Sequence, residues 1–314
     1  MRPILAVSVD TLPTSCNLGP RNCGANRAEG QAGVCGADDT LRIARAALHL
    51  WEEPCISVGA GSGTVFFTGC PLRCVYCQNY DIAHGDHGTV ISPRRLEDIY
   101  LELQDQGAAN INLVTATQYV PQVVQTIRGA RQRGLRLPVV FNTSGYETVQ
   151  TIELLRGTVD VYLADFKYWK SDESDAAVRY SHAKDYFSVA GEALDAMVAQ
   201  IGEMQVQGDV LTRGVVLRHL LLPGRLQDSM KLMAFLWDRY GDSVLYSVMN
   251  QYTPVRQVPG MPELDASPSE AEYEVLLDFL DDLGMDQYFW QEGGANKESF
   301  IPPFDNTGVY PERS

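Results

Sequence analysis

Thr64-Val65-Phe66-Phe67-Thr68-Gly69-Cys70-Pro71-Leu72-Arg73-Cys74-Val75-Tyr76-Cys77-Gln78-Asn79 is the stretch around which the remainder of this chain is arranged. It begins as a short apolar strand and runs into a loop with three cysteines at the spacing C-x3-C-x2-C. Thiolates are soft ligands that favour zinc, copper(I) or iron–sulfur clusters. A structural zinc site or a cubane cluster usually takes four protein ligands, so three cysteines would leave one metal position open, as catalytic metal sites do.

The overall composition restricts the class of protein. The chain has 314 residues, 45% of them hydrophobic, which is enough for one large core with extensions. A formal charge of -15 argues against nucleic acid as a partner. There is no apolar run of about 20 residues for a membrane helix, and residues 1–14 lack the pattern of a secretory signal. Seven cysteines, three of them in one loop, argue against a disulfide framework. We therefore expect a cytoplasmic protein that does not associate with membranes.

Apolar strand-like segments alternate with helical segments from Gly63 onward. The predicted strands are 64–68, 111–115, 138–142, 159–164, 214–221 and 244–249, and the predicted helices are 93–106, 121–133, 146–155, 191–207 and 227–240. Continuous apolar strands separated by helices indicate a parallel sheet buried on both faces. The expected fold class is α/β, a partial (β/α)6 TIM-like barrel whose chemistry lies at the carboxyl ends of the strands.

Three regions of the chain are expected. Residues 1–58 form a Cys/Gly-rich N-terminal extension with a helix over 40–51, and residues 59–255 form the barrel. Residues 256–314 add a helix that begins with a capping box at Ser267-Pro268-Ser269-Glu270. The apolar tail 300–304 is expected to pack back on the body, and the acidic residues between 263 and 292 to face solvent.

The cysteine spacing, Tyr76 and the pair Gln78-Asn79 resemble the radical S-adenosylmethionine (radical SAM) superfamily. Much of the chain is similar to an uncharacterised subgroup homologous to pyruvate formate-lyase activating enzyme. The resemblance implies that Cys70, Cys74 and Cys77 hold one 4Fe-4S cluster whose fourth iron binds S-adenosyl-L-methionine (SAM). It places Tyr76 against the adenine of SAM, adds Asn79 to the cofactor-binding residues, and implies a single-electron donor such as a flavodoxin or ferredoxin.

Polar residues at the predicted strand ends extend this resemblance. They are Thr115 and Thr117 after the second strand; Asn142, Thr143 and Ser144 after the third; Asp165 and Lys167 after the fourth; Arg218, Pro223 and Gly224 from the fifth; and Tyr252 after the sixth. By resemblance these residues bind SAM. Residues 179–186 are a candidate substrate-side loop or the start of a surface helix.

A second cysteine set lies in the N-terminal extension. Cys16, Cys23 and Cys35 match a pattern of the same subgroup, but Gly19 stands where that pattern has a further cysteine. A four-thiolate metal site at this place would therefore lack one ligand, unless Cys55 or another residue replaces it. Whether this segment binds a second metal is left open by the sequence.

The resemblance implies an enzyme that reductively cleaves SAM to a 5'-deoxyadenosyl radical, which abstracts hydrogen from a substrate. Two such activities remain open, a glycyl-radical activating enzyme acting on a partner protein, and modification of a peptide or small molecule. The alternative from another class is a non-catalytic protein in which cysteines bind zinc or iron–sulfur for structure or electron transfer. No catalytic residue and no substrate can be read from the sequence.

Overall fold

The structure is a computed structural model that describes residues 11–85, 87–291 and 301–310. Its strands are β1 (Leu41–His49), β2 (Ser62–Phe67), β3 (Thr89–Ile91), β4 (Ile111–Val114), β5 (Val139–Thr143), β6 (Val161–Asp165), β7 (Gln205–Gln207), β8 (Val210–Leu220), β9 (Leu245–Met249) and β10 (Tyr288–Phe289). Its α-helices are α1 (Tyr80–Ala83), α2 (Pro93–Asp105), α3 (Val120–Gln132), α4 (Val149–Leu154), α5 (Ala176–Ser181), α6 (Tyr186–Ile201), α7 (Leu226–Tyr240) and α8 (Glu270–Asp282). Four 3-10 helices cover Arg27–Glu29, Thr117–Tyr119, Gly241–Ser243 and Pro262–Asp265.

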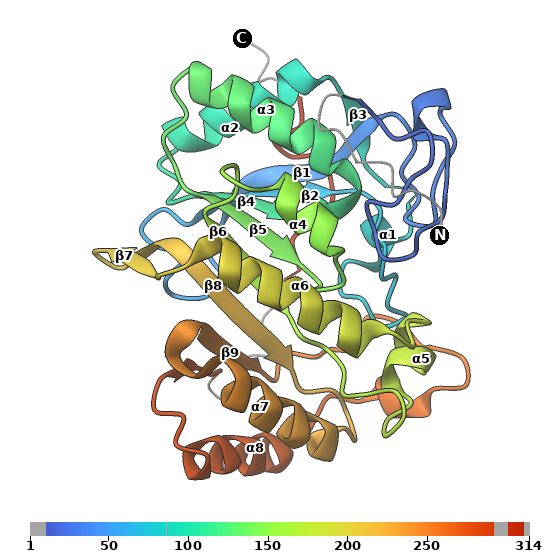
Figure 1. The fold of residues 1–314 in the computed structure, drawn as a ribbon, viewed down its shortest axis with the longest axis vertical. Coiled ribbons are helices and arrows are strands. Elements are labelled where there is room, and N and C mark those ends of the chain that lie inside the picture. The colour runs from blue at the N-terminus through green and yellow to red at the C-terminus, as the bar shows by residue number, and fades with distance from the viewer. Residues whose placement is uncertain (1–10, 86, 292–300, 311–314) are drawn as a thin grey trace.

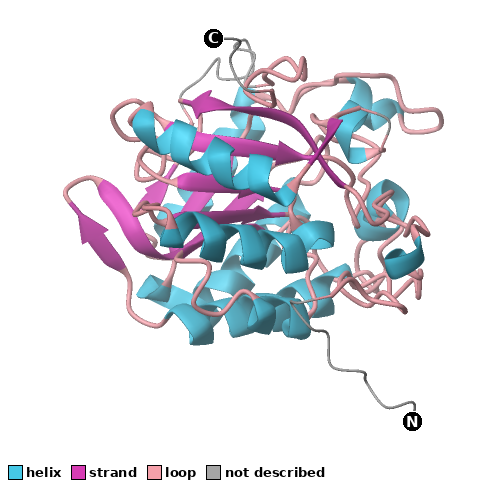
Figure 2. Ribbon diagram, turned by 90° about the horizontal axis from the view of Figure 1, so that it is seen from above, coloured by secondary structure: helices cyan, strands magenta, loops and turns pink. Residues whose placement is uncertain are grey.

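The strands form one sheet in the order β10-β9-β8-β6-β5-β4-β2-β1-β3, with β7 paired to β8. The six strands from β2 to β9 along this path are parallel, whereas β1 and β3 are added antiparallel at one edge. The sheet does not close within the described residues, so the predicted partial α/β barrel is confirmed. The parallel strands end on the right of Figure 1, where α1, α5 and the N-terminal segment lie. Seen from above, most of the loops gather at one end of the strands (Figure 2).

Both faces of the parallel strands are buried because side chains alternate between them. On β6, Tyr162 and Ala164 join the core against the helices, while Val161 and Leu163 join a second apolar cluster. We call this second set the inner cluster; its members are Ile56, Val140, Val161, Leu163, Leu211 and Val216. The inner cluster therefore fills the concave side of the sheet, and the polar residues of the site continue the same alternation toward the strand ends.

The helix predicted over 40–51 is wrong. Residues Leu41–His49 form β1, which pairs antiparallel with both β2 and β3. The alanines in this segment favour a helix locally, but pairing on two sides satisfies its backbone and buries Leu41 and Ile43. A register shift between Ile43 and Arg45 also buries Ala44, which obscures the two-residue period in the sequence.

The C-terminal part of the chain is described for α8 and for residues 301–310. A capping box begins α8, but two residues later than predicted: Ser269, not Ser267, is the N-cap and accepts from Glu272 N, while the Glu272 side chain accepts from Ser269 N. Phe304 packs edge-on against Phe66 with ring centroids 5.5 Å apart, as expected for a tail that returns to the body. Phe300, also part of that prediction, lies outside the described residues.

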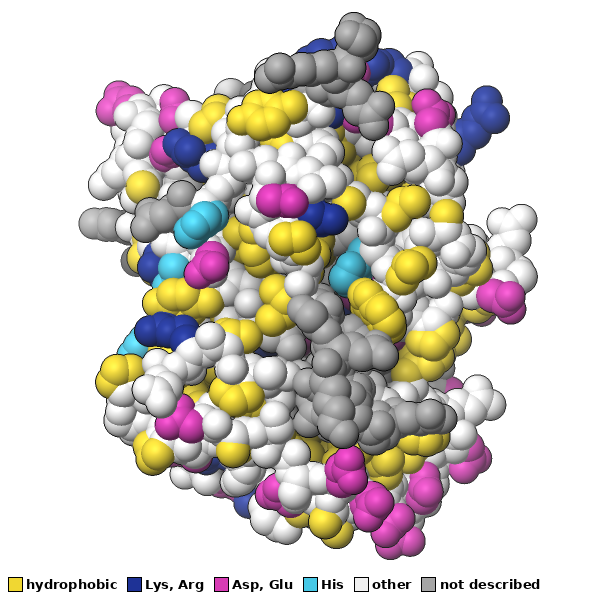
Figure 3. All heavy atoms as spheres, turned by 180° about the vertical axis from the view of Figure 1, so that it is seen from behind, with side chains coloured by type: hydrophobic (Ala, Val, Ile, Leu, Met, Phe, Trp, Pro, Cys, Tyr) yellow, Lys and Arg dark blue, Asp and Glu magenta, His cyan; other side chains and the backbone are white. Residues whose placement is uncertain are grey.

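Two surface features complete the fold. Acidic side chains gather at lower right in Figure 3, the α8 end of the molecule, as expected for the segment that lacks basic residues. One of its acids, Glu263, pairs with Arg179 at 2.8 Å. Among the described helices, none is long and apolar enough to cross a membrane.

The tail after Phe304 continues along β1, where Asn306 N donates to Ala44 O and Ala46 N donates to Thr307 O. Gly308 has φ +70°, and a Cβ added there would lie 1.9 Å from Ala46 O. Gly308→Ala is therefore expected to destabilise the protein by the cost of a left-handed alanine, about 1–2 kcal/mol, plus about 1–3 kcal/mol for the clash. Urea unfolding measures the loss.

The control for this substitution is Gly157→Ala, because Gly157 has φ +71° and nothing within 4 Å of an added Cβ. It should show only the backbone cost. Equal losses for the two variants would mean that the tail does not contribute to stability through β1.

Candidate functional site

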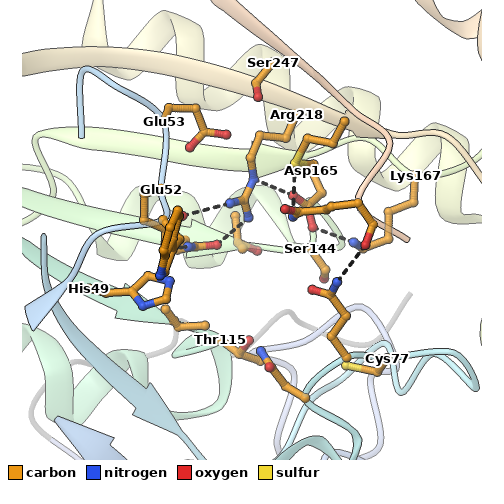
Figure 4. A pocket seen from close by; sticks show the side chains of 18 of the residues that line it. His49, Glu52, Glu53, Cys77, Thr115, Ser144, Asp165, Lys167, Arg218 and Ser247 are labelled. Carbon is orange, nitrogen blue, oxygen red and sulfur yellow. Dashed lines mark hydrogen bonds and ion pairs between the residues drawn. The ribbon is translucent and has the colours of Figure 1, made fainter. Parts of the chain in front are cut away.

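A cavity of about 290 Å³ opens at the carboxyl ends of the parallel strands, next to the three-cysteine loop (Figure 4). Twelve residues predicted from the sequence line it: Cys70, Cys74, Tyr76, Cys77, Asn79, Thr115, Asn142, Thr143, Ser144, Asp165, Lys167 and Arg218. They come from β5, β6 and β8 and from the loops that follow β2, β4, β5 and β6. The parallel arrangement brings them together because these strands end at one edge of the sheet.

The loop with the three cysteines is fastened by the N-terminal segment. Cys70 N donates to Cys35 O at 3.1 Å, and Arg21 Nε donates to Pro71 O at 3.0 Å. The preceding Gly69 has φ +87°, and a Cβ there would lie 2.4 Å from Cys35 O. Only glycine allows this close approach, so the N-terminal segment and the loop are built against each other.

Two thiols of this loop, those of Cys70 and Cys77, lie in an environment that disfavours free thiolates. Burial and repulsion from Cys74 raise the pKa of Cys70 to about 11 and also raise that of Cys77. The Ser181 hydroxyl donates to Cys74 Sγ at 3.0 Å. A bound cationic centre would reverse this preference, because metal coordination deprotonates thiols.

Arg218 is the centre of a buried polar network on the concave face. Its Nε donates to Asp165 Oδ1 at 2.8 Å, its Nη2 to Asn142 Oδ1 at 2.7 Å, and its Nη1 to Glu52 Oε2 at 3.2 Å. Glu52 Oε1 accepts from Asn112 Nδ2 at 3.0 Å and from Asn142 Nδ2 at 3.2 Å. The network thus connects β4, β5, β6 and β8 with the segment that follows β1 (Figure 4).

The alternation along the strands explains why these side chains meet. Asn142 lies two residues after Val140, Arg218 two after Val216, and Asp165 two after Leu163, and these three apolar residues all belong to the inner cluster. Residues two apart on a strand point to the same face. The concave face is therefore apolar near the strand starts and polar near their ends.

The acids in and beside this network differ in the direction in which their pKa is shifted. Burial alone would raise the pKa of Asp165, but Arg218 and Lys167 outweigh it, so the pKa is lowered and the carboxylate is ionised. Lys167 Nζ donates to Asp165 Oδ2 at 2.5 Å. For Glu52 and Glu53, burial outweighs the attraction of Arg218 and raises the pKa of both.

Two residues outside the cavity hold its wall in place. The Tyr186 hydroxyl accepts from Lys167 N at 2.9 Å and donates to Ser144 O at 2.8 Å, which joins the loops after β5 and β6. The Glu147 carboxylate accepts from the hydroxyls of Thr117 and Thr143 at 2.6 and 2.5 Å. Residues 179–186, the candidate substrate-side loop, do not line the cavity. They lie outside it, where Tyr186 hydrogen-bonds the backbone of the wall residues Lys167 and Ser144.

Four predicted cofactor-binding residues do not line the cavity: Thr117, Pro223, Gly224 and Tyr252. Thr117 is buried and bonds Glu147 instead. Tyr252 packs edge-on against Tyr76, with centroids 6.0 Å apart, and its hydroxyl donates to Leu264 O.

The sequence reasoning missed several residues of the cavity wall, among them His49, Trp51, Glu52, Glu53, Ser247 and Trp290. Ser247 could have been found from its position two residues after Leu245, which packs on the inner cluster. The adjacent acids Glu52 and Glu53 carried no comparable signal, because they belong to an irregular connection.

The N-terminal cysteines gather at a separate, much smaller cavity of about 20 Å³. Cys16, Cys23, Cys35 and Gly19 line it. Cys55 lies elsewhere, half-buried against the inner cluster, so it does not replace the ligand missing at Gly19. In the described part of the chain, no three His, Cys, Asp or Glu side chains converge closely enough for a single metal ion. A second metal stays a prediction.

Comparisons with known proteins agree with the sequence resemblance. Residues 64–202 match the family model of the Radical SAM superfamily. The uncharacterized protein MJ0674 of Methanocaldococcus jannaschii is 26% identical over 279 residues, which cover 87% of this chain and 76% of the relative.

Solved structures show a more distant similarity. SuiB of Streptococcus suis bound to S-adenosylmethionine matches with a TM-score of 0.48 and 12% identity over 72% of this chain and 49% of SuiB, so the alignment spans about half of its length. A radical SAM methyltransferase from Sphaerobacter thermophilus matches with a TM-score of 0.49 and 16% identity over 74% of this chain and 67% of the enzyme.

Replacing Arg218 should be severely destabilising. Arg218→Met leaves the buried carboxylate of Glu52 without its cation and removes one of the two cations at Asp165. Loss of one member of a buried ion pair costs about 3–5 kcal/mol. The control is Arg156→Met, which breaks an exposed pair with Glu153 and should cost about 0–1 kcal/mol. Similar denaturation midpoints for the two variants would contradict the role given to Arg218.

Glu147 should make stability depend on pH. Burial raises its pKa from 4.5 to about 7, so the folded state binds a proton that the unfolded state has released between these values. Wild-type stability should therefore fall by up to about 3 kcal/mol as pH rises from 4.5 to 7, at 1.36 kcal/mol per unit, relative to Glu147→Gln. Urea unfolding of both proteins across this range measures it, and parallel curves would contradict the prediction.

Proposed function

We propose that this chain, whose residues 64–202 match the radical SAM family model, reductively cleaves SAM and directs the resulting radical to a substrate bound in the same cavity. The observation that supports this most is the meeting of three cysteines with a polar strand-end surface in one cavity. A purely structural metal site would not need a cavity or the polar ends of three further strands.

The residues present fit a 4Fe-4S cluster with an open iron. Cys70, Cys74 and Cys77 all border the cavity, and no further cysteine is among the described residues that line it. Three thiolates leave one coordination position free for a ligand that occupies the cavity. When bound, the cluster and SAM supply one-electron cleavage of a carbon–sulfur bond and a 5'-deoxyadenosyl radical that abstracts hydrogen.

The residues of this chain would bind and orient the cofactor. Lys167 and Arg218 present positive charge to the cavity, which suits a carboxylate, although both are already engaged by Asp165. Asn142, Thr143 and Ser144 add short hydrogen-bonding groups at the end of β5. Tyr76 is held by a 3.0 Å hydrogen bond from the Tyr168 hydroxyl, so its ring has a fixed orientation at the cavity wall.

Two substrate classes are compatible with the proposed reaction. One candidate is a partner protein that receives a glycyl radical, and the other is a peptide or small molecule that enters the cavity. The second is favoured by the extent of the cavity beyond the cysteines, because its wall includes Glu53, Ser247 and Trp290. A flavodoxin or ferredoxin is the proposed electron donor.

Anaerobic reconstitution with iron and sulfide tests the proposal. The wild-type chain should bind about four irons and form 5'-deoxyadenosine from SAM when dithionite is added. A Cys70→Ala/Cys74→Ala/Cys77→Ala variant should lose both the iron and the product. Cys55→Ala, which changes a thiol that does not line the cavity, is the matched control and should keep both.

Two outcomes would contradict it. A reconstituted cluster that yields no 5'-deoxyadenosine would support a non-catalytic metal or electron-transfer protein. Zinc bound in place of iron, with no product, would support a structural zinc site. Metal that survives the triple substitution would indicate a second site at Cys16, Cys23 and Cys35.

A further inference from the structure

Glu53 is a buried acid in the cavity wall with an unmet hydrogen-bonding requirement. Its side chain is 7% exposed and borders the cavity. Its Oε2 is buried and has no hydrogen-bond partner among the described residues. Leaving a buried carboxylate oxygen without a partner costs several kcal/mol. Such an oxygen therefore calls for a functional explanation, of which a ligand that binds to it is one.

The charge balance of the wall points to a cationic ligand. Three acids, Glu52, Glu53 and Asp165, share the wall with two bases, Lys167 and Arg218. All three nitrogens of the Arg218 guanidinium already donate, to Asp165, Glu52 and Asn142. Lys167 is engaged by Asp165. Of the acids described in this wall, Glu53 alone has no ion pair, so a cation bound beside it would give it the partner that Arg218 and Lys167 give to Glu52 and Asp165.

The position of Glu53 separates it from the cofactor-binding end. In Figure 4, Glu53 and Ser247 lie at one end of the cavity and Cys77 at the other, with Arg218 and Asp165 between them. A group bound next to the cysteines would meet Lys167 and Asp165 before Glu53. The unpaired carboxylate therefore faces the part of the cavity that a second molecule would occupy.

Aromatic side chains line the same cavity. Trp51 and Trp290 are 52% and 54% exposed, and Phe289 adjoins Trp290 in the wall. Aromatic faces attract organic cations and pack against aliphatic chains. They suit an alkylammonium or guanidinium group better than a small metal ion, for which the described residues offer no converging ligands.

We infer that Glu53 binds a protonated amine or guanidinium group of the substrate, which positions the remainder of that molecule toward the three-cysteine end of the cavity. The inference rests on the proposed function, because it takes from it that a substrate occupies the cavity together with SAM. It narrows the substrate class to cationic compounds or to peptides with a lysine, an arginine or a free amino terminus. Glu52, already paired with Arg218, instead stabilises the polar network of the wall.

Binding of simple cations tests this inference without turnover. The probes are butylammonium and butylguanidinium, with butan-1-ol and butanoate as the neutral and anionic counterparts. Each is titrated by calorimetry into the full-length, anaerobically reconstituted chain with SAM present. Because hydrogen bonds to charged groups are strong, wild type should bind the cations at least about tenfold more tightly than butan-1-ol.

The variants assign this preference to one residue. Glu53→Gln should abolish the tenfold preference, and Glu53→Asp should keep part of it, since the charge remains at a shorter reach. Glu274→Gln, which removes an exposed acid of α8, should bind as wild type does. If Glu53→Gln does not fold, the comparison of Glu53→Asp with wild type still tests the assignment.

Equal affinity for the four probes in wild type, or an undiminished cation preference in Glu53→Gln, would overturn the inference. Neither result depends on SAM cleavage, which is measured in the wild-type protein as 5'-deoxyadenosine. Cleavage without cation preference would thus reject only the role of Glu53, while cation binding without cleavage would reject only the radical reaction.

Discussion

The polar interior of this protein depends on one buried guanidinium. Arg218 bonds Asp165 on β6, Asn142 on β5 and Glu52 in the segment after β1, so one side chain connects three parts of the chain that are far apart in sequence. Charges buried in this way are tolerated only when each is paired and hydrogen-bonded. The network therefore has few alternative arrangements, and a ligand meets groups that are already oriented.

The same interior is organised in layers by the two-residue period of the strands. The inner cluster, with Val140, Leu163 and Val216, fills the concave side near the strand starts. One step further along the same strands come Asn142, Asp165 and Arg218, and beyond them lies the loop with the three cysteines. An apolar floor under a polar layer keeps bulk water away from the groups that would surround a reactive intermediate.

The N-terminal region is part of the barrel in structural terms. It contributes β1 to the sheet, and Arg21 and Cys35 fasten the backbone of the cysteine loop. Glu52 and Glu53 reach from it into the cavity. This dependence explains why a Gly-rich segment with little capacity to form its own core is ordered here: the loop that it fastens also supplies its packing surface.

The sequence by itself determined the parallel strands, their helices and the three cysteines, because each is encoded in a local pattern: continuous apolar runs, helical spacing and C-x3-C-x2-C. It also indicated Asn142, Asp165, Lys167 and Arg218, since residues at parallel strand ends share one edge of the sheet. Only the tertiary structure decided that residues 41–49 are a strand, because pairing with β2 and β3 overrides their local helical preference. Only the tertiary structure brought Glu52 and Glu53 to Arg218, because an irregular connection has no period from which the direction of its side chains could be read.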